Sequence, residues 1–380
     1  MIRPDRLTDT FLDLVRIDSE SFHERQVAEW IAAKVREMGA EVSFDDAGAA
    51  IGGDCGNLFA RFAPTSEALP PILLSAHMDT VTPGRGIRPQ IHPDRITSDG
   101  TTILGADDKS GCAIILEALR VVLENRIPHG VIEVCFSVAE EQGLRGVKEL
   151  DTGRLQSKRG VVFDSGDARC IFNTGPAADR MEWIVHGLAA HGGVHPENGI
   201  SAVRIAAAAI TSMPHGRIDA ETTCNIGVVE AAGATNIVPP RVRVLGEARS
   251  RDPEKLARLS ATMSKCFHDA VANAPTVEIH ETKHRATLEE TIRRDYESLD
   301  VAPDATTIAL VQDAANRLDR KLYLASMGGG CDANVFNRRG IECINLGTGM
   351  RDPHTLSEWL DRRDFESAAA LLVEIVKGSA

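Results

Sequence analysis

The chain reads Ile72-Leu-Leu-Ser-Ala-His77-Met-Asp79, a short apolar segment that ends in a histidine and a carboxylate. Two further segments of this kind span residues 131–138 and 160–163. Short, nearly continuous apolar runs are typical of strands that are covered on both faces. Between the first two segments, residues 110–124 have the length and apolar periodicity of a helix. Strands that alternate with helices predict an α/β sheet flanked by helices.

Each apolar segment ends in potential metal ligands. The carboxyl ends of parallel strands share one edge of an open α/β sheet, so side chains that follow different strands converge there. A loop before the predicted helix and a late histidine add further donors. The set comprises His77, Asp79, Asp107, Asp108, Glu140, Glu141, Asp164 and His354.

The donor types favour a particular kind of metal centre. Two histidines and several carboxylates, with no cysteine among them, suit zinc, cobalt or manganese. Even five ligands from this set exceed what one tetrahedral catalytic zinc needs, because that ion keeps a position open for water. They divide well between two ions about 3.5 to 4 Å apart that share a carboxylate. The residues therefore indicate a two-metal hydrolytic centre, without deciding which of Glu140 and Glu141 binds metal.

The pattern changes near residue 178. Six segments follow in the order β-α-β-β-α-β, at residues 181–186, 202–213, 223–229, 241–248, 253–273 and 276–282. This order is that of a ferredoxin-like α+β domain. The α/β texture returns after residue 291. We therefore predict a discontinuous catalytic domain, residues 1–177 and 288–380, interrupted by an inserted domain, residues 178–287.

Two smaller motifs carry local predictions. Ser21 and Glu24 have the spacing of a capping box before a helical pattern. Gly328-Gly329-Gly330 is not followed by the Lys-Ser/Thr of a phosphate-binding loop. We expect a tight turn there, with the backbone around Gly329 near the substrate and Asp332 capping the next helix.

Charge and cysteine usage exclude several partners. Lys and Arg number 42 against 55 Asp and Glu, a formal net charge of −13. No basic field is present to hold nucleic acid or an anionic membrane surface. No apolar run is long enough to span a membrane, and acidic residues interrupt any signal-like start. Eight cysteines lie scattered without a C-x-x-C pair, so we expect free thiols in the cytoplasm.

Taken together, the motifs resemble the M20 metallopeptidases in order and spacing. They are His77-Met-Asp79-Thr-Val, Gly105-Ala-Asp107-Asp-Lys, Ala139-Glu140-Glu141-Gln-Gly, Asp164, Ala190-His191-Gly-Gly, Asn236-Ile-Val-Pro239, Gly328-Gly-Gly-Cys-Asp332-Ala-Asn and His354-Thr. The resemblance covers nearly the whole chain. The nearest subgroup is the peptidase T-like tripeptidases, through Gly246-Glu-Ala-Arg249-Ser and the segment 330–337. The chain departs from the usual pattern at Cys331, Pro353 and Leu356.

The resemblance implies a zinc-exopeptidase-like catalytic domain that holds two divalent ions, zinc first and cobalt or manganese otherwise. Asp107 would bridge the ions. His77 and Asp164 would complete one site, and Glu141 and His354 the other. Asp79 would orient His77, as metal-bound imidazoles require. Glu140 would stay unligated as the general base, taking a proton from the metal-bridging water and passing it to the leaving amine.

The same resemblance gives roles to the inserted domain as a lid and dimerisation domain. His191 would donate a hydrogen bond to the tetrahedral oxyanion, reaching the site from the partner subunit of a homodimer. Asn236 and Arg249 would help to hold the substrate, Arg249 because guanidinium binds carboxylate in a bidentate manner. Without the resemblance, Arg249 would be read as a salt-bridged strand residue.

The function implied is release of the N-terminal residue of short peptides, chiefly tripeptides. An amidohydrolase acting on N-acyl or N-carbamoyl amino acids would share the metal site and differ only in the pocket. A non-catalytic metal- or amino-acid-binding module is disfavoured because Glu140 is present. A two-metal phosphoesterase is disfavoured because no basic phosphate clamp accompanies the ligand motifs.

Overall fold

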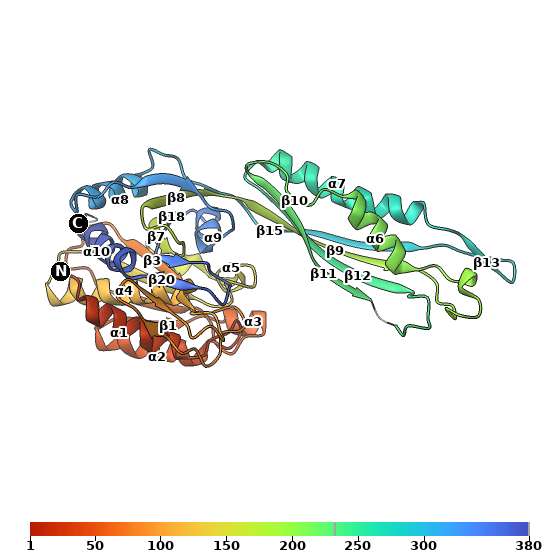
Figure 1. Cartoon of the computed structure of the whole chain (residues 1–380). Helices are drawn as coiled ribbons and strands as arrows, with labels where there is room; N and C mark the ends of the chain where they lie inside the picture. The colour runs from red at the N-terminus through yellow and green to blue at the C-terminus, as the bar shows by residue number, and fades with distance from the viewer. Residues whose placement is uncertain (232, 379–380) are drawn as a thin grey trace. The chain divides into compact units, whose positions relative to one another are not determined.

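The computed structural model describes residues 1–231 and 233–378, which form two compact units (Figure 1). The first unit is Met1–Gly175 together with the chain from Leu299 onward, and the second is Pro176–Ser298. All eight cysteines carry free thiols. Within the described residues, no helix combines the length and the apolarity needed to cross a membrane.

A nine-stranded mixed sheet forms the centre of the first unit. Its order is β1-β2-β6-β3-β7-β18-β8-β16, with β17 also paired to β8. The four inner strands run parallel, and antiparallel pairs extend the sheet on both sides. The strands are β1 (Glu41–Phe44), β2 (Leu58–Phe62), β3 (Ile72–His77), β6 (Ile132–Ser137), β7 (Arg159–Phe163), β8 (Cys170–Gly175), β16 (Leu299–Asp300), β17 (Tyr323–Ser326) and β18 (Glu342–Leu346).

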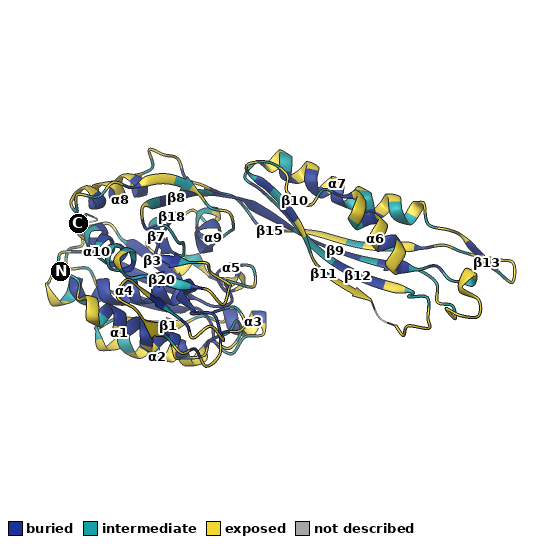
Figure 2. Ribbon diagram, in the orientation of Figure 1, coloured by how far each residue is buried: buried dark blue, intermediate teal, exposed yellow. Residues whose placement is uncertain are grey.

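Helices flank this sheet, which confirms the predicted fold class (Figure 2). α4 packs on β3 and contacts α1 and α10, whereas α9 packs on β18 and contacts α5. Every residue of β3 and β6 is buried, as the apolar runs predict. The helices are α1 (Pro4–Val15), α2 (Arg25–Glu37), α3 (Ala47–Ile51), α4 (Ala106–Glu124), α5 (Arg145–Glu149), α8 (Thr306–Asn316), α9 (Asp332–Arg338) and α10 (Arg362–Gly378).

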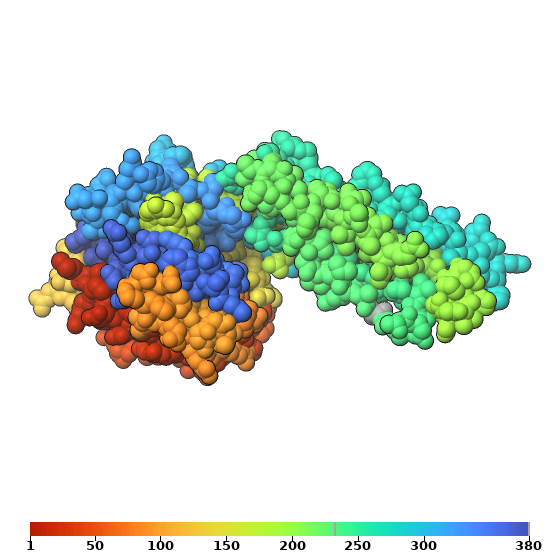
Figure 3. Space-filling model, in the orientation of Figure 1, coloured from red at the N-terminus to blue at the C-terminus, as the bar shows by residue number. Residues whose placement is uncertain are grey.

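The first and last helices of the chain meet in this unit. The ring of Phe11 in α1 lies edge-on to that of Phe365 in α10, with centroids 5.6 Å apart. In the space-filling view the N-terminal residues in red and the C-terminal residues in dark blue form adjacent parts of the surface (Figure 3). The contact explains how a discontinuous domain closes around one core.

A smaller sheet of four short strands completes the first unit. Its order is β19-β20-β5-β4, and the loop between β19 and β20 carries His354. The strands are β4 (Gln90–Ile91), β5 (Arg95–Thr97), β19 (Met350–Arg351) and β20 (Trp359–Asp361).

The second unit has the predicted ferredoxin-like order, with one additional short strand, β10, between α6 and β11. Its sheet runs β10-β11-β12-β9-β15 with all neighbours antiparallel, and α6 and α7 both pack on β9 and β12. Trp183 of β9 stacks on Phe267 of α7 in its core, with ring centroids 4.3 Å apart. The elements are β9 (Ala177–His186), α6 (Ala202–Ser212), β10 (Gly216–Arg217), β11 (Thr222–Ala231), β12 (Arg241–Ser250), α7 (Pro253–Ala272) and β15 (Thr287–Tyr296).

Two local predictions are wrong. The segment 276–282 is not the fourth strand of this sheet but part of a separate hairpin, β13 (Val277–Ile279) and β14 (Thr282–His284). The place of the last predicted strand is taken by β15, which pairs with β9, so the unit extends to Ser298 rather than to residue 287. Ser21 and Glu24 do not form a capping box, because the Glu24 side chain makes no hydrogen bond that caps α2.

Candidate metal centre

His77 is the last residue of β3, and its imidazole is almost fully buried. Its Nδ1 lies 2.9 Å from the backbone oxygen of Asp79 and 3.3 Å from that residue's Oδ1. Two oxygens facing Nδ1 favour the tautomer that carries the proton there. Nε2 lies 3.0 Å from Oδ1 of Asp107, and in this tautomer its lone pair would be available to a cation bound between the two groups.

Asp107 lies between two histidines. While its Oδ1 faces His77, its Oδ2 is 3.2 Å from Nε2 of His354. The same His354 nitrogen is 2.9 Å from Oε1 of Glu141. Asp107 and Asp108 have non-helical backbone angles at the start of α4, and the peptide between them is cis. The two distances show that one carboxylate presents its oxygens to imidazoles contributed by β3 and by the β19–β20 loop.

Two potential ligand groups result, and they share Asp107. One is His77, Asp107 and Asp164, and the other is Asp107, Glu141 and His354, with the ligand atoms of each group within 4.8 Å of one another. All five predicted metal ligands are thus brought together in the first unit. A carboxylate shared between two sets of N and O donors fits a pair of divalent ions.

Glu140 belongs to neither ligand group. Its side chain is buried, with 8% of the residue exposed, and its backbone N–H donates to Asp79 Oδ1 at 3.0 Å. The N–H of Glu141 donates to Asp79 Oδ2 at 3.3 Å. Asp79 therefore contacts both His77 and the turn that carries the two glutamates. Glu140 is next to Glu141 in this turn but is not one of the potential metal ligands.

The site concentrates negative charge that a cation would compensate. Burial raises the pKa values of Glu140 and Asp164 well above their usual range, and neighbouring carboxylates add to the effect. Burial also opposes ionisation of Asp107, but the imidazoles of His354 and His77 outweigh it and lower the pKa of that carboxyl. Contacts with Asp107 and Glu141 raise the pKa of His354 to about 10. Divalent cations at the two ligand groups would compensate this buried negative charge.

Two further buried carboxylates lie at this site. The sequence gives no prediction for Glu358 and a wrong one for Asp332. Glu358 accepts the backbone N–H groups of Leu104, Gly105 and Asp107 at 2.7, 2.8 and 3.0 Å, and burial raises its pKa to about 7. Its only sequence signal is its position four residues after His354. Asp332 was expected to cap α9, but Cys331 occupies the cap position.

Asp332 instead accepts a hydrogen bond from Ser137 at the end of β6. Burial raises the pKa of Asp332 to about 6. Gly329, the remaining predicted residue of the first unit, lies in the bend between β17 and α9. Gly329 therefore belongs to the segment that leads into α9, and Asp332 is the first residue of that helix.

The other predicted residues lie in the second unit. His191 forms an isolated β-bridge with Ile237, and the N–H of Gly192 donates to the backbone oxygen of Asn236 at 2.7 Å. The loops that carry His191 and Asn236 are therefore side by side. Arg249 of β12 pairs with Glu247, with Nη2 3.0 Å from Oε2.

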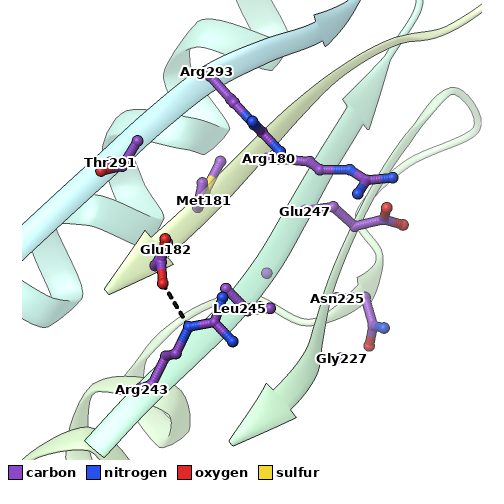
Figure 4. A pocket seen from close by; sticks show the side chains of 11 residues that line it. Arg180, Met181, Glu182, Asn225, Gly227, Arg243, Leu245, Glu247, Thr291 and Arg293 are labelled. Carbon is purple, nitrogen blue, oxygen red and sulfur yellow. Dashed lines mark hydrogen bonds and ion pairs between the residues drawn. The ribbon is translucent and has the colours of Figure 1, made fainter. Parts of the chain in front are cut away.

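A groove of about 550 Å³ lies on the strands of the second unit (Figure 4). Its charged side chains are mostly paired within the unit: Arg243 with Glu182 at 2.5 Å, and Arg180 with Asp295 at 2.7 Å. Among the described residues, none of those predicted for the site lines it. We assign this groove no part in the metal chemistry.

A shared carboxylate between two histidines, beside an unligated buried glutamate at the carboxyl edge of parallel strands, is typical of two-metal hydrolases. A family model for "Peptidase family M20/M25/M40" matches residues 73–378. The chain belongs to this family, which confirms the resemblance seen in its motifs.

Three relatives cover essentially the whole chain. The uncharacterized protein YqjE of Bacillus subtilis is 38% identical over 381 residues, with 100% of both chains covered. The crystal structure of aminopeptidase PepT from Bacillus cereus is 38% identical, with a TM-score of 0.84 and 100% and 99% of the two chains covered. A tripeptidase from Staphylococcus aureus is 34% identical, with a TM-score of 0.89 and coverage of 99% and 98%.

Proposed function

We propose that this protein is a two-metal aminopeptidase that releases the N-terminal residue of tripeptides. The observation that carries the proposal is Asp107, whose oxygens lie 3.0 and 3.2 Å from the Nε2 atoms of His77 and His354. The names of the solved relatives, an aminopeptidase and a tripeptidase, favour a peptide over an N-acyl or N-carbamoyl amino acid.

The two ligand groups indicate which residues would hold the ions. His77 and Asp164 would bind one, Glu141 and His354 the other, and Asp107 both. Zinc suits this mixture of imidazole and carboxylate, with cobalt or manganese as alternatives. When bound, the ions would polarise the scissile carbonyl and lower the pKa of a water molecule.

The protein's own groups would then move the protons and hold the substrate. Glu140 would accept the proton of the attacking water on a carboxylate oxygen and return it to the leaving amine nitrogen. His191 would donate to the oxyanion from the partner subunit of a homodimer. Asn236, Arg249 and the backbone around Gly329 would hold the peptide. The eight free thiols are compatible with the cytoplasm, where we place the protein.

A substrate panel tests the proposed activity. Wild-type protein loaded with zinc, cobalt or manganese is assayed with tripeptides, the same tripeptides acetylated at the amine, and N-acetyl and N-carbamoyl amino acids. We expect kcat/KM for free tripeptides to exceed that for every blocked compound by roughly 10²-fold or more, since a site that binds an amine rejects analogues without it. Preference for an N-acyl or N-carbamoyl amino acid would instead favour the amidohydrolase.

Metal stoichiometry is a second expected result. Protein stripped with a chelator should lose activity and should take up two divalent ions per chain on titration, measured by elemental analysis. Asp164→Ala should lose one ion, because Asp164 belongs to one ligand group, whereas Asp107→Ala should lose both. A single tight ion with full activity contradicts the two-metal centre.

A further inference from the structure

The turn that carries Glu140 and Glu141 is held by three successive backbone amides. The N–H of Ala139 donates to Glu24 Oε1 at 2.9 Å. The next two amides, of Glu140 and Glu141, donate to the two oxygens of Asp79 at 3.0 and 3.3 Å. Two carboxylates from distant parts of the sequence therefore fix the backbone immediately before and at the proposed base.

The backbone at this point needs such support. Ala139 has φ of +48°, in the left-handed region that residues with a Cβ atom rarely adopt. Glu140 follows it directly, so relaxation of Ala139 to an ordinary conformation would redirect the Glu140 side chain. Strained backbone persists only where surrounding contacts hold it.

The Glu24 side chain accepts from the turn and makes no hydrogen bond that caps the helix after it, α2. It is fully buried, and its Oε1 also accepts the N–H of Phe22 at 2.9 Å. Its Oε2 has no hydrogen-bond partner among the described residues. Three residues earlier, the hydroxyl of Ser21 donates to Asp79 Oδ2 at 2.7 Å. Glu24 is thus one carboxylate anchor of the turn, and Ser21 contacts the other, Asp79.

We propose that Ser21 and Glu24 are positioning residues that hold the turn 139–141 so that Glu140 is aimed at the reacting water. The inference rests on the proposed function, which it deepens. The contact of Glu24 with the turn is an acceptor oxygen, Oε1, for the N–H of Ala139. Glutamine at position 24 would keep that acceptor.

A second role for Glu24 must be distinguished from this one. Glu24, Asp54 and Cys55 also offer ligand atoms within 4.8 Å of one another. If Glu24 acted through a cation held there, glutamine would fail as a replacement and Asp54→Asn or Cys55→Ser would impair activity. If Glu24 positions the turn, those two variants should be neutral.

The experiment compares Glu24→Gln with Glu24→Met, which has similar length and no acceptor oxygen. We expect Glu24→Met to lower kcat by about tenfold or more, since small misplacements of catalytic groups have effects of that order. KM should change by less than about threefold, because substrate contacts remain. Two bound ions should be retained, and Glu24→Gln should stay close to wild type. The measurements are tripeptide kinetics and metal content per folded chain.

Amide hydrogen exchange gives a readout that needs no catalysis. In Glu24→Met, exchange in the peptide spanning residues 137–143 should accelerate by roughly tenfold, while exchange in β3 stays unchanged. A matched control is Glu133→Met, which removes another buried carboxylate that holds backbone, the amides of Gln156 and Ser157. It should reduce stability without changing kcat per folded chain.

The outcomes separate cleanly. If kcat and exchange in Glu24→Met match wild type, or if Glu24→Gln is as impaired as Glu24→Met, the positioning role is wrong. If Glu24→Met does not fold, Ser21→Ala replaces it: slower turnover and faster exchange at unchanged melting temperature support the role, and wild-type values overturn it. If wild-type protein cleaves no tripeptide, the proposed function fails, and exchange alone decides whether Glu24 holds the turn.

Discussion

Replacing Glu140 with alanine is expected to lower kcat by roughly 10²- to 10⁴-fold, the usual contribution of a general base. The metal content should remain nearly intact, because Glu140 belongs to neither ligand group. KM should change little, since the lost interaction acts in the transition state rather than in substrate binding. Tripeptide kinetics and elemental analysis on the same preparation measure both quantities.

Two comparisons make this result specific. Asp107→Ala should be inactive for a different reason, the loss of both ions, so activity and metal content fall together. Glu141→Ala should lose the ion that His354 shares with it. A fall smaller than about tenfold in Glu140→Ala would contradict its role. Loss of an ion from Glu140→Ala, with retention in Glu141→Ala, would exchange the two roles.

The grouping of residues in the candidate metal centre was predictable because they follow strands whose burial is visible in the sequence. His77, the Glu140 and Glu141 pair, and Asp164 each come directly after an apolar run, and parallel strands bring their ends together. The shared position of Asp107 was available only from the family resemblance. The position of Asp107 in a loop before a helix does not reveal that its carboxylate faces both His77 and His354.

Contacts between distant segments were not predictable. Ser21 and Glu24 have a local spacing that suits a capping box, but the Glu24 carboxylate accepts from Ala139, 115 positions further along the chain. Glu358 likewise serves the backbone of the Asp107 loop, about 250 positions earlier. A buried carboxylate that binds backbone amides has no periodicity, so only the folded structure assigns its partner.

The last strand of the second unit was missed for a physical reason. β15 lies at the edge of its sheet, and its sequence, Thr287-Leu-Glu-Glu-Thr-Ile-Arg-Arg-Asp-Tyr296, is half charged and mostly exposed. Natural edge strands carry such residues to avoid pairing with other chains. The composition therefore hides the strand, whereas the less charged segment 276–282 imitates one and forms only a short hairpin.

Mixing inactive Glu140→Ala chains with inactive His191→Ala chains is expected to restore part of the activity if His191 reaches the active site of the partner subunit. The N–H of Gly193 donates to Nδ1 of His191 at 3.1 Å, so a neutral ring carries its proton on Nε2, where it can donate to an oxyanion. His191 is exposed, and the apolar side chains of Val194 and Ile237 beside it are 61% and 41% exposed. An exposed donor among exposed apolar groups suits a surface that a partner covers.

His191→Ala should lower kcat by roughly 10²- to 10³-fold, as loss of an oxyanion donor does. His195→Ala, in the same loop, should stay active. In a heterodimer of Glu140→Ala with His191→Ala, the chain that retains Glu140 receives His191 from its partner, so one of the two sites is intact. Random exchange makes half of the dimers mixed, and about a quarter of wild-type activity should return. If differently tagged subunits exchange and no activity appears, His191 acts in its own chain or not at all.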